Sequence, residues 1–308
     1  MYTQSETKSL EEEQAFSQEL ERSGTVEKGT KRSVEVFSSC ILTCLLLMFS
    51  SGLACGKDDD SILYRHTFEI GLGVTFLDYE EDLEDLSVEL DGFMHGVIGS
   101  YTYHNKIMFS ASVEYSTGDL HYYGYRQIGT PVATGGEDWI VECRGLFGYD
   151  YVIRGSRVLT PFLGIGYRYW NDDIQGYGGY EREIEYWYSP IGLKTCSPLS
   201  DNWTWGISLE YDLFWDGKGN TSSLNDPEFD RFPEFDQDSG YGARFSLQFN
   251  SQLNKHCSLS IEPYIMYWNI DQSEIVTVYE APWPLPSLYA QEPDNETTSY
   301  GLRVSVEF

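Results

Sequence analysis

Residues 203–215 read Trp-Thr-Trp-Gly-Ile-Ser-Leu-Glu-Tyr-Asp-Leu-Phe-Trp, and every odd position carries an aromatic or large aliphatic side chain. The positions between them are small or polar as far as Asp212. Alternation with a period of two is typical of a β-strand with one apolar and one polar face. Twelve steps of about 3.3 Å, tilted by about 40°, rise roughly 30 Å, close to the apolar band of a transmembrane barrel. Strands of soluble sheets are usually about half as long. The stretch therefore predicts a membrane-spanning strand.

The same alternation recurs along the chain. Clear examples are residues 67–76, 107–115, 163–169, 241–249, 259–267 (interrupted by Pro263) and 300–308, and weaker ones lie near 88–104, 137–153 and 182–197. With the first stretch these give about ten strands, and eight or twelve remain compatible with the weaker examples. An even number of antiparallel strands places both chain ends on one side of the membrane, which we expect to be the periplasm.

The connections between these stretches fall into two classes. Short ones are expected at 104–106, 154–157, 197–202 and 252–256, and long ones at 78–87, 118–136, 172–181, 216–239 and 271–296. Short turns on one side and long loops on the other are typical of bacterial outer-membrane barrels. We therefore predict an all-β fold, a transmembrane antiparallel up-and-down β-barrel of about ten strands in the outer membrane.

Composition and charge narrow the class of protein further. The mean hydropathy is −0.38, and only Cys40–Leu53 is apolar enough to be considered as a spanning helix. The formal net charge is −29, and residues 55–308 hold 41 acidic against 15 basic residues. This charge argues against a nucleic-acid partner and against simple attraction to anionic headgroups, and it permits cationic partners.

The first 54 residues have the character of an export segment. Lys31-Arg32 precede a short apolar run that ends in the small-residue site Gly52-Leu-Ala54. A basic start, a short apolar run and a small-x-small site predict a secretory signal cleaved near 54/55, behind a polar extension. Residues 55–308 then form the barrel. Cys55 leaves lipidation as an alternative, although Gly52 stands where a lipidation site wants an aliphatic residue.

The chain ends in alternating aromatic and aliphatic residues with Phe last, which resembles the signal by which outer-membrane barrels are recognised for assembly. This ending predicts outer-membrane lipid and the barrel assembly machinery as partners. The residues concerned are Tyr300, Leu302, Val304, Val306 and Phe308.

If the apolar faces contact lipid, the opposite faces line the barrel interior. They carry acids and bases together, and such groups in a narrow barrel are expected to pair, because an unpaired buried charge is costly. We predict an ion-pair network that plugs the interior, while small inward residues such as Gly164 and Ser246 keep a narrow pore open as an alternative. The network comprises Glu69, Glu114, Glu142, Arg144, Arg168, Glu210, Asp212, Arg244, Glu262, Arg303 and Glu307.

Two predicted loops have a distinctive composition. Residues 226–238 are acidic and aromatic, which predicts a solvated loop. We expect no cofactor, and a divalent cation bound by the clustered carboxylates of this loop is the weaker alternative. Residues 281–289 hold aromatic residues between prolines, and exposed aromatic residues often mark contact surfaces. The predicted surface-binding residues are Phe229, Phe232, Phe235, Trp283 and Tyr289.

The predicted strand number and the blocks 162–170 and 186–194 resemble the omptin family of outer-membrane proteases. The resemblance implies a ten-stranded barrel that rises above the membrane. It also implies water activated between an Asp-x-Asp pair on the second external loop and an Asp-x-His pair on the fourth.

This sequence departs from that pattern, because the predicted fourth loop, 216–239, has no histidine. The two motifs occur with their loops exchanged, as Asp119-Leu-His121 and Asp236-Gln-Asp238. A histidine oriented by an aspartate and facing a carboxylate pair can act as a general base. We therefore expect a non-enzymatic barrel whose loops bind an extracellular ligand or serve a structural role, with an omptin-like endopeptidase and a narrow channel as alternatives.

Overall fold

The protein is described by a computed structural model, which covers residues 63, 65–83, 86–125, 131–153, 157–175, 180–222, 234–255, 257–279 and 288–308. The predicted signal segment, Cys55, Phe229, Phe232 and Trp283 lie outside these residues. Ten long strands dominate the fold: β1 (His66–Leu83), β2 (Leu86–Asn105), β3 (Ile107–Tyr125), β4 (Pro131–Tyr149), β6 (Arg157–Ile174), β7 (Glu181–Pro198), β8 (Trp203–Ser222), β10 (Gly240–Asn254), β11 (Cys257–Ile270) and β14 (Asp294–Glu307). Four short strands accompany them: β5 (Tyr151–Ile153), β9 (Phe235–Gln237), β12 (Val276–Tyr279) and β13 (Leu288–Ala290).

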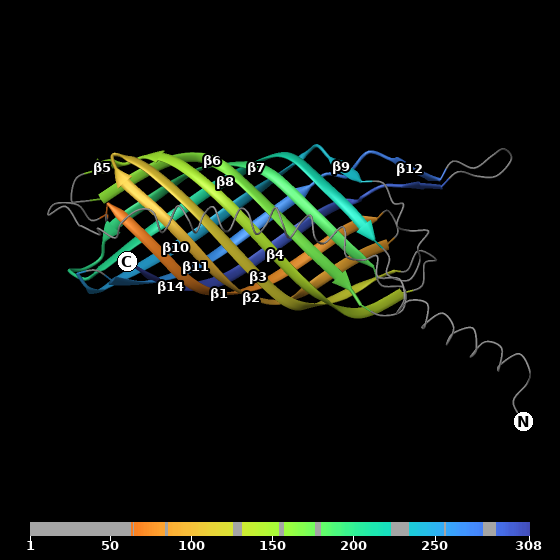
Figure 1. The fold of residues 1–308 in the computed structure, drawn as a ribbon, viewed down its shortest axis with the longest axis horizontal. Coiled ribbons are helices and arrows are strands. Elements are labelled where there is room, and N and C mark those ends of the chain that lie inside the picture. The colour runs from red at the N-terminus through yellow and green to blue at the C-terminus, as the bar shows by residue number, and fades with distance from the viewer. Residues whose placement is uncertain are drawn as a thin grey trace, which may run out of the picture. The chain divides into compact units, whose positions relative to one another are not determined.

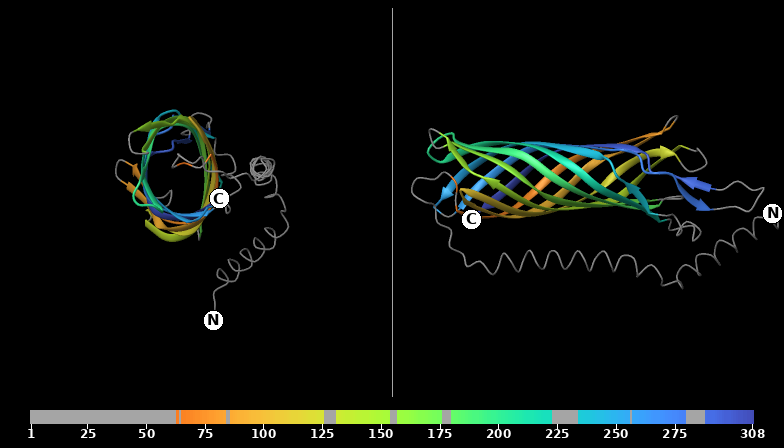
Figure 2. Two further views of the ribbon diagram at one scale, coloured as in Figure 1. Left: turned by 90° about the vertical axis from the view of Figure 1, so that its left-hand side faces the viewer. Right: turned by 90° about the horizontal axis from the view of Figure 1, so that it is seen from above.

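The ten long strands close into a barrel in which every neighbour is antiparallel. The order is β10-β11-β14-β1-β2-β3-β4-β6-β7-β8, and β8 pairs with β10 to complete the ring (Figures 1 and 2). The first and last strands meet, and the amide groups and carbonyls of Phe68 and Phe308 exchange two hydrogen bonds of 3.1 and 2.8 Å. The predicted ten-stranded antiparallel barrel is confirmed.

The two ends of the barrel differ, as the sequence indicated. At one end, called here the turn end, short connections join β2 to β3 and β10 to β11. At the other, the loop end, β8 is joined to β10 through β9, and β11 to β14 through the β12–β13 hairpin. Within the described part of the chain, no helix is long and apolar enough to cross a membrane.

Three of the predicted long loops, 78–87, 118–136 and 172–181, were wrong, because much of each is strand. β1 reaches Leu83 and β2 begins at Leu86, so two residues separate them. The reason is a change of phase in the alternation. Ile70 and Val74 point outward, whereas Leu77 and Tyr79, three and five residues beyond Val74, point inward and are buried. A scan for one continuous apolar face stops at this change, although backbone pairing continues.

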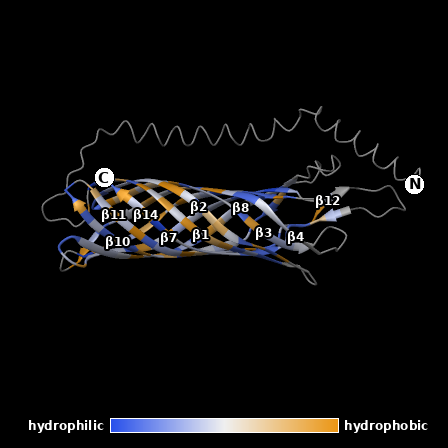
Figure 3. Ribbon diagram, turned by 90° about the horizontal axis from the view of Figure 1, so that it is seen from below, coloured by the Kyte–Doolittle hydropathy of each residue, from blue (hydrophilic) through white to orange (hydrophobic). Residues whose placement is uncertain are grey.

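Near the turn end the outward face of the barrel is apolar, as expected for contact with lipid hydrocarbon. Ile70 and Leu72 on β1 are exposed on the outside, as are Leu163 on β6, Leu209 on β8 and Leu302 on β14. In Figure 3, hydrophobic and hydrophilic positions alternate along these strands. The predicted lipid-facing pattern therefore exists as an exposed outer surface.

Candidate functional site: the filled barrel interior

A layer of ion pairs crosses the middle of the barrel; we call it the belt and define it by Glu142, Arg144, Glu210, Asp212 and Arg244. Arg244 donates from Nε to Asp212 Oδ2 at 2.6 Å and from Nη1 to Glu142 Oε2 at 2.7 Å. Arg144 pairs with Glu210, which also lies 3.3 Å from Arg244 Nε. These residues come from β4, β8 and β10, so the belt links strands on different sides of the ring.

The other predicted network residues also line the interior. Arg303 pairs with Glu114 at 2.7 Å and lies 3.7 Å from Glu262. Glu69 accepts hydrogen bonds from Ser100 at 2.8 Å and from Ser305 at 2.5 Å. Arg168 is buried and donates to the sulfur of Met266 at 3.8 Å, and Glu307 accepts from Gln248 at 3.5 Å.

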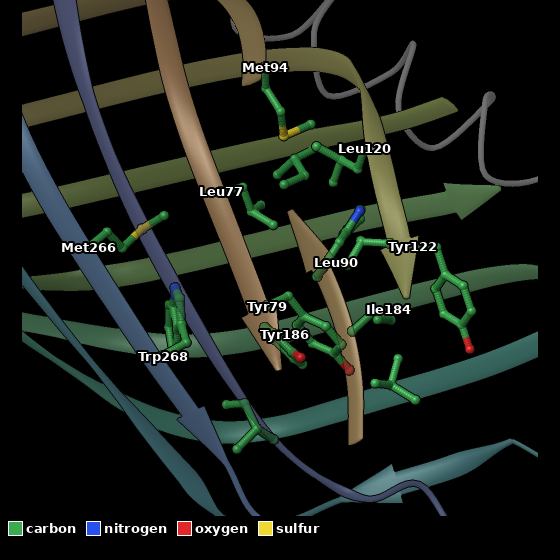
Figure 4. Packing of buried hydrophobic residues seen from close by; sticks show 14 of the residues in the cluster. Leu77, Tyr79, Leu90, Met94, Leu120, Tyr122, Ile184, Tyr186, Met266 and Trp268 are labelled. Atoms are coloured by element: carbon green, nitrogen blue, oxygen red, sulfur yellow. The ribbon is translucent and has the colours of Figure 1, made fainter. Parts of the chain in front are cut away.

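On the loop side of the belt the interior is apolar, which the sequence did not predict. Buried aromatic and aliphatic side chains converge there from opposite strands (Figure 4); we call this cluster the plug. Trp268 packs against Tyr188 and Tyr186, with ring centroids 5.0 and 5.9 Å apart. The plug comprises Leu77, Tyr79, Val88, Leu90, Met94, Leu120, Tyr122, Ile140, Trp170, Ile174, Ile184, Tyr186, Tyr188, Met266, Trp268 and Ile270.

A second charged cluster lies at the loop end, around Arg182 of β7. Its guanidinium donates from Nε to Asp172 Oδ2 at 2.8 Å, pairs with Glu81, and lies 3.8 Å from Glu292. The hydroxyl of Tyr79 also donates to Glu81, at 2.6 Å. Three carboxylates therefore surround one cation in a buried site.

Sequence reasoning missed this Arg182 cluster. Arg182 occupies an inward position, because it alternates with Ile184, Tyr186 and Tyr188, which all point inward. That alternation is the signal that could have located it. The partners could not have been found in this way, since they lie on β1, on β6 and after β13.

Two segments fold over the loop end; we call them straps. In the first, β9 pairs with β8, and Phe235 and Gln237 point inward and are buried. In the second, residues 271–275 and 291–293 are joined through Ser273, whose Oγ accepts from the Glu292 amide at 2.9 Å. Gln237 links the two straps by donating to the Asp271 carbonyl at 3.1 Å. The straps hold Glu292 against the Arg182 cluster.

Glu292, in the second strap, is a carboxyl whose protonation depends on pH near neutrality. It follows β13 and belongs to no strand. Burial and the nearby carboxylate of Glu81 raise the pKa of the Glu292 carboxyl to about 7, against the opposing effect of Arg182. A buried carboxyl that faces other carboxylates takes up a proton more readily than one in water. The second strap therefore packs most favourably while Glu292 is protonated.

The structure does not bring the candidate catalytic residues together. Asp119 and His121 lie on β3 with exposed side chains, while the alternating Leu120 and Tyr122 point inward. Asp236 lies on β9 and is exposed, as is Asp238. β3 pairs with β2 and β4, whereas β9 pairs with β8, so the two motifs occupy separate sides of the ring. The first motif faces outward, away from any interior cleft.

The predicted surface-binding residues have different positions. Phe235 is 4 % exposed, so its prediction as a surface contact was wrong; the pairing of β9 with β8 turns it into the interior. Tyr289 on β13 is 61 % exposed. In the terminal strand, Tyr300, Leu302, Val304 and Phe308 are exposed and Val306 is half-buried.

No group of three or more histidine, cysteine or acidic residues is arranged to hold a metal ion in the described ranges. The acidic stretch 226–238 is described only from residue 234 onward, so a divalent cation there stays a prediction.

Searches with the sequence found no matching family model and no matching curated protein. Solved structures gave matches. The outer-membrane protease OmpT from Escherichia coli aligns with a TM-score of 0.56 at 10% identity, over 84% of this chain and 99% of OmpT. The translocator domain of the autotransporter NalP from Neisseria meningitidis has a TM-score of 0.37 at 9% identity, over 93% of this chain and 99% of that domain. At such identities the similarity concerns the fold alone. The chain is a closed ten-stranded antiparallel barrel with omptin-like architecture.

Proposed function

We propose that this protein resides in the bacterial outer membrane, with its turn end in the periplasm, and that its loop end binds a protein partner outside the cell. The observation that carries this proposal is the filled interior: the plug and the belt occupy the barrel between the loop end and the turn end. A barrel filled in this way is unsuited to passing solutes, so its function is expected to lie on its surface.

The β12–β13 hairpin is the best candidate for the contact. Figure 1 shows the hairpin standing beyond the ends of the long strands. At the base of the hairpin, Ile275, the last residue of the second strap before β12, is 66 % exposed, and Tyr289 of β13 is 61 % exposed; exposed acidic residues, including Glu274, accompany them. An exposed aromatic and aliphatic pair with an acidic rim favours a partner that presents apolar and basic side chains.

The two alternatives have less support. A channel would need the plug to leave the interior. An omptin-like endopeptidase would need Asp119 and His121 to face a carboxylate pair, and both point away from the interior.

Binding of a fluorescent peptide of alternating lysine and leucine to the full-length folded barrel in nanodiscs tests the proposal. Folding is checked by heat-shifted gel mobility. Replacing both Ile275 and Tyr289 with Ser should weaken binding by about tenfold or more, the loss expected for a contact worth ~1.4 kcal/mol. Leu253→Ser is the matched control, because Leu253 is 60 % exposed on β10 at the turn end.

Equal affinity in the double variant and in the wild type would refute the role of the hairpin, as would equal binding of a peptide of alternating glutamate and leucine. Single-channel recordings of the wild type should show no conductance steps. Cleavage of a peptide library that disappears in His121→Ala would instead establish the protease.

A further inference from the structure

The turn-end half of the interior contains a polar cavity of about 340 Å³. Arg144, Glu210 and Arg244 of the belt line its inner end, and Asp201 and Asn202, exposed in the β7–β8 turn, line its mouth. The cavity is therefore closed by the belt and open at the turn end. Its volume lies in the range of about 300–1,000 Å³ that is usual for small-molecule sites.

Many of the residues that line the cavity carry hydroxyl or side-chain amide groups. Ser100, Ser112, Thr160, Ser208, Ser246 and Gln248 line it from five different strands. Hydroxyl groups can both donate and accept hydrogen bonds, so this wall suits a solute that itself carries several hydroxyl groups.

Three of the four cations in the wall are paired. Arg144 pairs with Glu210, Arg244 with Glu142 and Asp212, and Arg303 with Glu114. The side-chain ammonium of the fourth, Lys194 of β7, has no hydrogen bond and no ion pair among the described residues. Its ammonium lies 5.3 Å from the ring centroid of Phe162. An enclosed cation without a carboxylate partner favours the entry of an anion.

The position of Lys194 defines how such an anion would be held. On the neighbouring strands, Lys194 is directly opposite Thr160 and Ser208, and both line the cavity. Lys194 thus has a hydroxyl-bearing residue opposite it on each neighbouring strand. Glu69, Glu262 and Glu307 also line the cavity and disfavour a ligand with several negative charges.

We propose that this cavity is a binding site for a small, hydroxyl-rich monoanion, such as a sugar acid, whose anionic group contacts Lys194 and whose hydroxyl groups contact the serine, threonine and glutamine side chains. The site is separate from the loop-end contact and does not depend on it. It would sample solutes on the turn side of the barrel.

Titration calorimetry on the folded full-length barrel in detergent tests the proposal, with glucuronate, glucose 6-phosphate and glucose as probes. Glucuronate should bind once per barrel and at least about tenfold more tightly than glucose, because a charge-assisted hydrogen bond is lost with the neutral sugar. Glucose 6-phosphate distinguishes a carboxylate site from a phosphate site, and tighter binding of either anion supports the proposal.

Lys194→Met retains the length of the side chain and removes its charge, so glucuronate binding should be lost. Lys194→Arg should retain it. Lys218→Met is the control, because Lys218 lies in the loop-end part of β8 and should not affect binding. Since Lys194 has no ion-pair partner among the described residues, Lys194→Met should fold at least as stably as the wild type.

Failure of both anions to bind the folded wild type would overturn the proposal. So would glucose that binds as tightly as glucuronate, or glucuronate binding unchanged in Lys194→Met. If Lys194→Met did not fold, the wild-type comparison of the three probes would still decide.

Discussion

Asp138 and Asp172 lie directly opposite each other on β4 and β6, and both residues are 0 % exposed. Among the described residues, only Asp172 has a cationic side chain within hydrogen-bond distance. Asp172 accepts from Arg182 Nε at 2.8 Å, whereas Asp138 accepts from the indole nitrogen of Trp170 at 2.8 Å. The pair is therefore electrostatically unequal.

This inequality predicts opposite effects of two similar substitutions. Asp138→Asn removes a carboxyl that can ionise beside Asp172 and leaves an acceptor for Trp170, so it should stabilise the barrel by about 1 kcal/mol at alkaline pH. Asp172→Asn removes a partner of buried Arg182 and should destabilise it by about 3 kcal/mol. Urea unfolding in micelles measures both, and destabilisation by both substitutions would contradict the assigned inequality.

The second strap should loosen as pH rises. The pKa of Glu292 is raised from its ordinary value of 4.5 to about 7, so the folded strap retains a proton that the unfolded chain loses above pH 4.5. Its stability is therefore greatest below pH 4.5 and falls up to about pH 7, by on the order of 3 kcal/mol. The charged groups that face this carboxyl are Glu81, Asp172 and Arg182.

Hydrogen exchange of residues 271–275 and 291–293 measures this effect. Exchange corrected for its intrinsic pH dependence should be faster at pH 8 than at pH 5, and Glu292→Gln should reduce the difference. If the difference in exchange rate between pH 5 and pH 8 were the same in Glu292→Gln as in the wild type, the pH dependence would arise from another group.

Removal of Arg244 should be among the most damaging substitutions in the belt. Arg244→Met leaves Glu142 and Asp212 without their shared cation, which should cost about 3–5 kcal/mol of unfolding free energy. Adding Glu142→Gln and Asp212→Asn should restore most of this loss, because no unpaired charge remains. Urea unfolding of the single and triple variants tests the pairing. The midpoints are compared only if the slope of the unfolding free energy against urea concentration is the same in each variant. No recovery in the triple variant would argue that Arg244 stabilises by packing.

The plug should contribute to stability as the core of a soluble protein does. Trp268→Ala removes a buried ring that packs against Tyr186 and Tyr188, so a loss of about 3–5 kcal/mol is expected. Trp215→Ala removes an exposed outward ring of the same size and should cost less. Equal losses would show that the plug is not a closely packed core.

The sequence allowed the barrel to be predicted because a lipid-facing strand follows a simple rule: apolar outward residues alternate with small or polar inward residues. Trp203 to Trp215 follow it without interruption, so the strand, its direction and its outward face could all be derived. The rule fails beyond the lipid, where Tyr79 and Trp268 point inward and outward positions are polar. Beyond the lipid-facing part of each strand, alternation no longer indicates which face points into the barrel, so the plug was not foreseen.

A periodic pattern predicts which side chains point inward, but it does not predict which of them contact each other across the interior. Arg144 and Glu210 were both predicted to point inward, but their pairing joins β4 to β8 and depends on closure of the ring. The same holds for Arg182 and Glu81. Phe235 was misplaced because a composition of acidic and aromatic residues does not reveal that β9 pairs with β8.

The change of phase between Val74 and Leu77 on β1 also has a consequence for how deep the protein sits. On the turn-end side of this change, the outward side chains are apolar and suit contact with lipid hydrocarbon. On the loop-end side, the outward side chains are polar and suit contact with water, and the inward side chains form the apolar plug. A vertical shift of the barrel would expose one of these surfaces to the wrong solvent. In the proposed outer-membrane location, this change in the outward face of β1 would therefore determine how far the loop end stands above the bilayer.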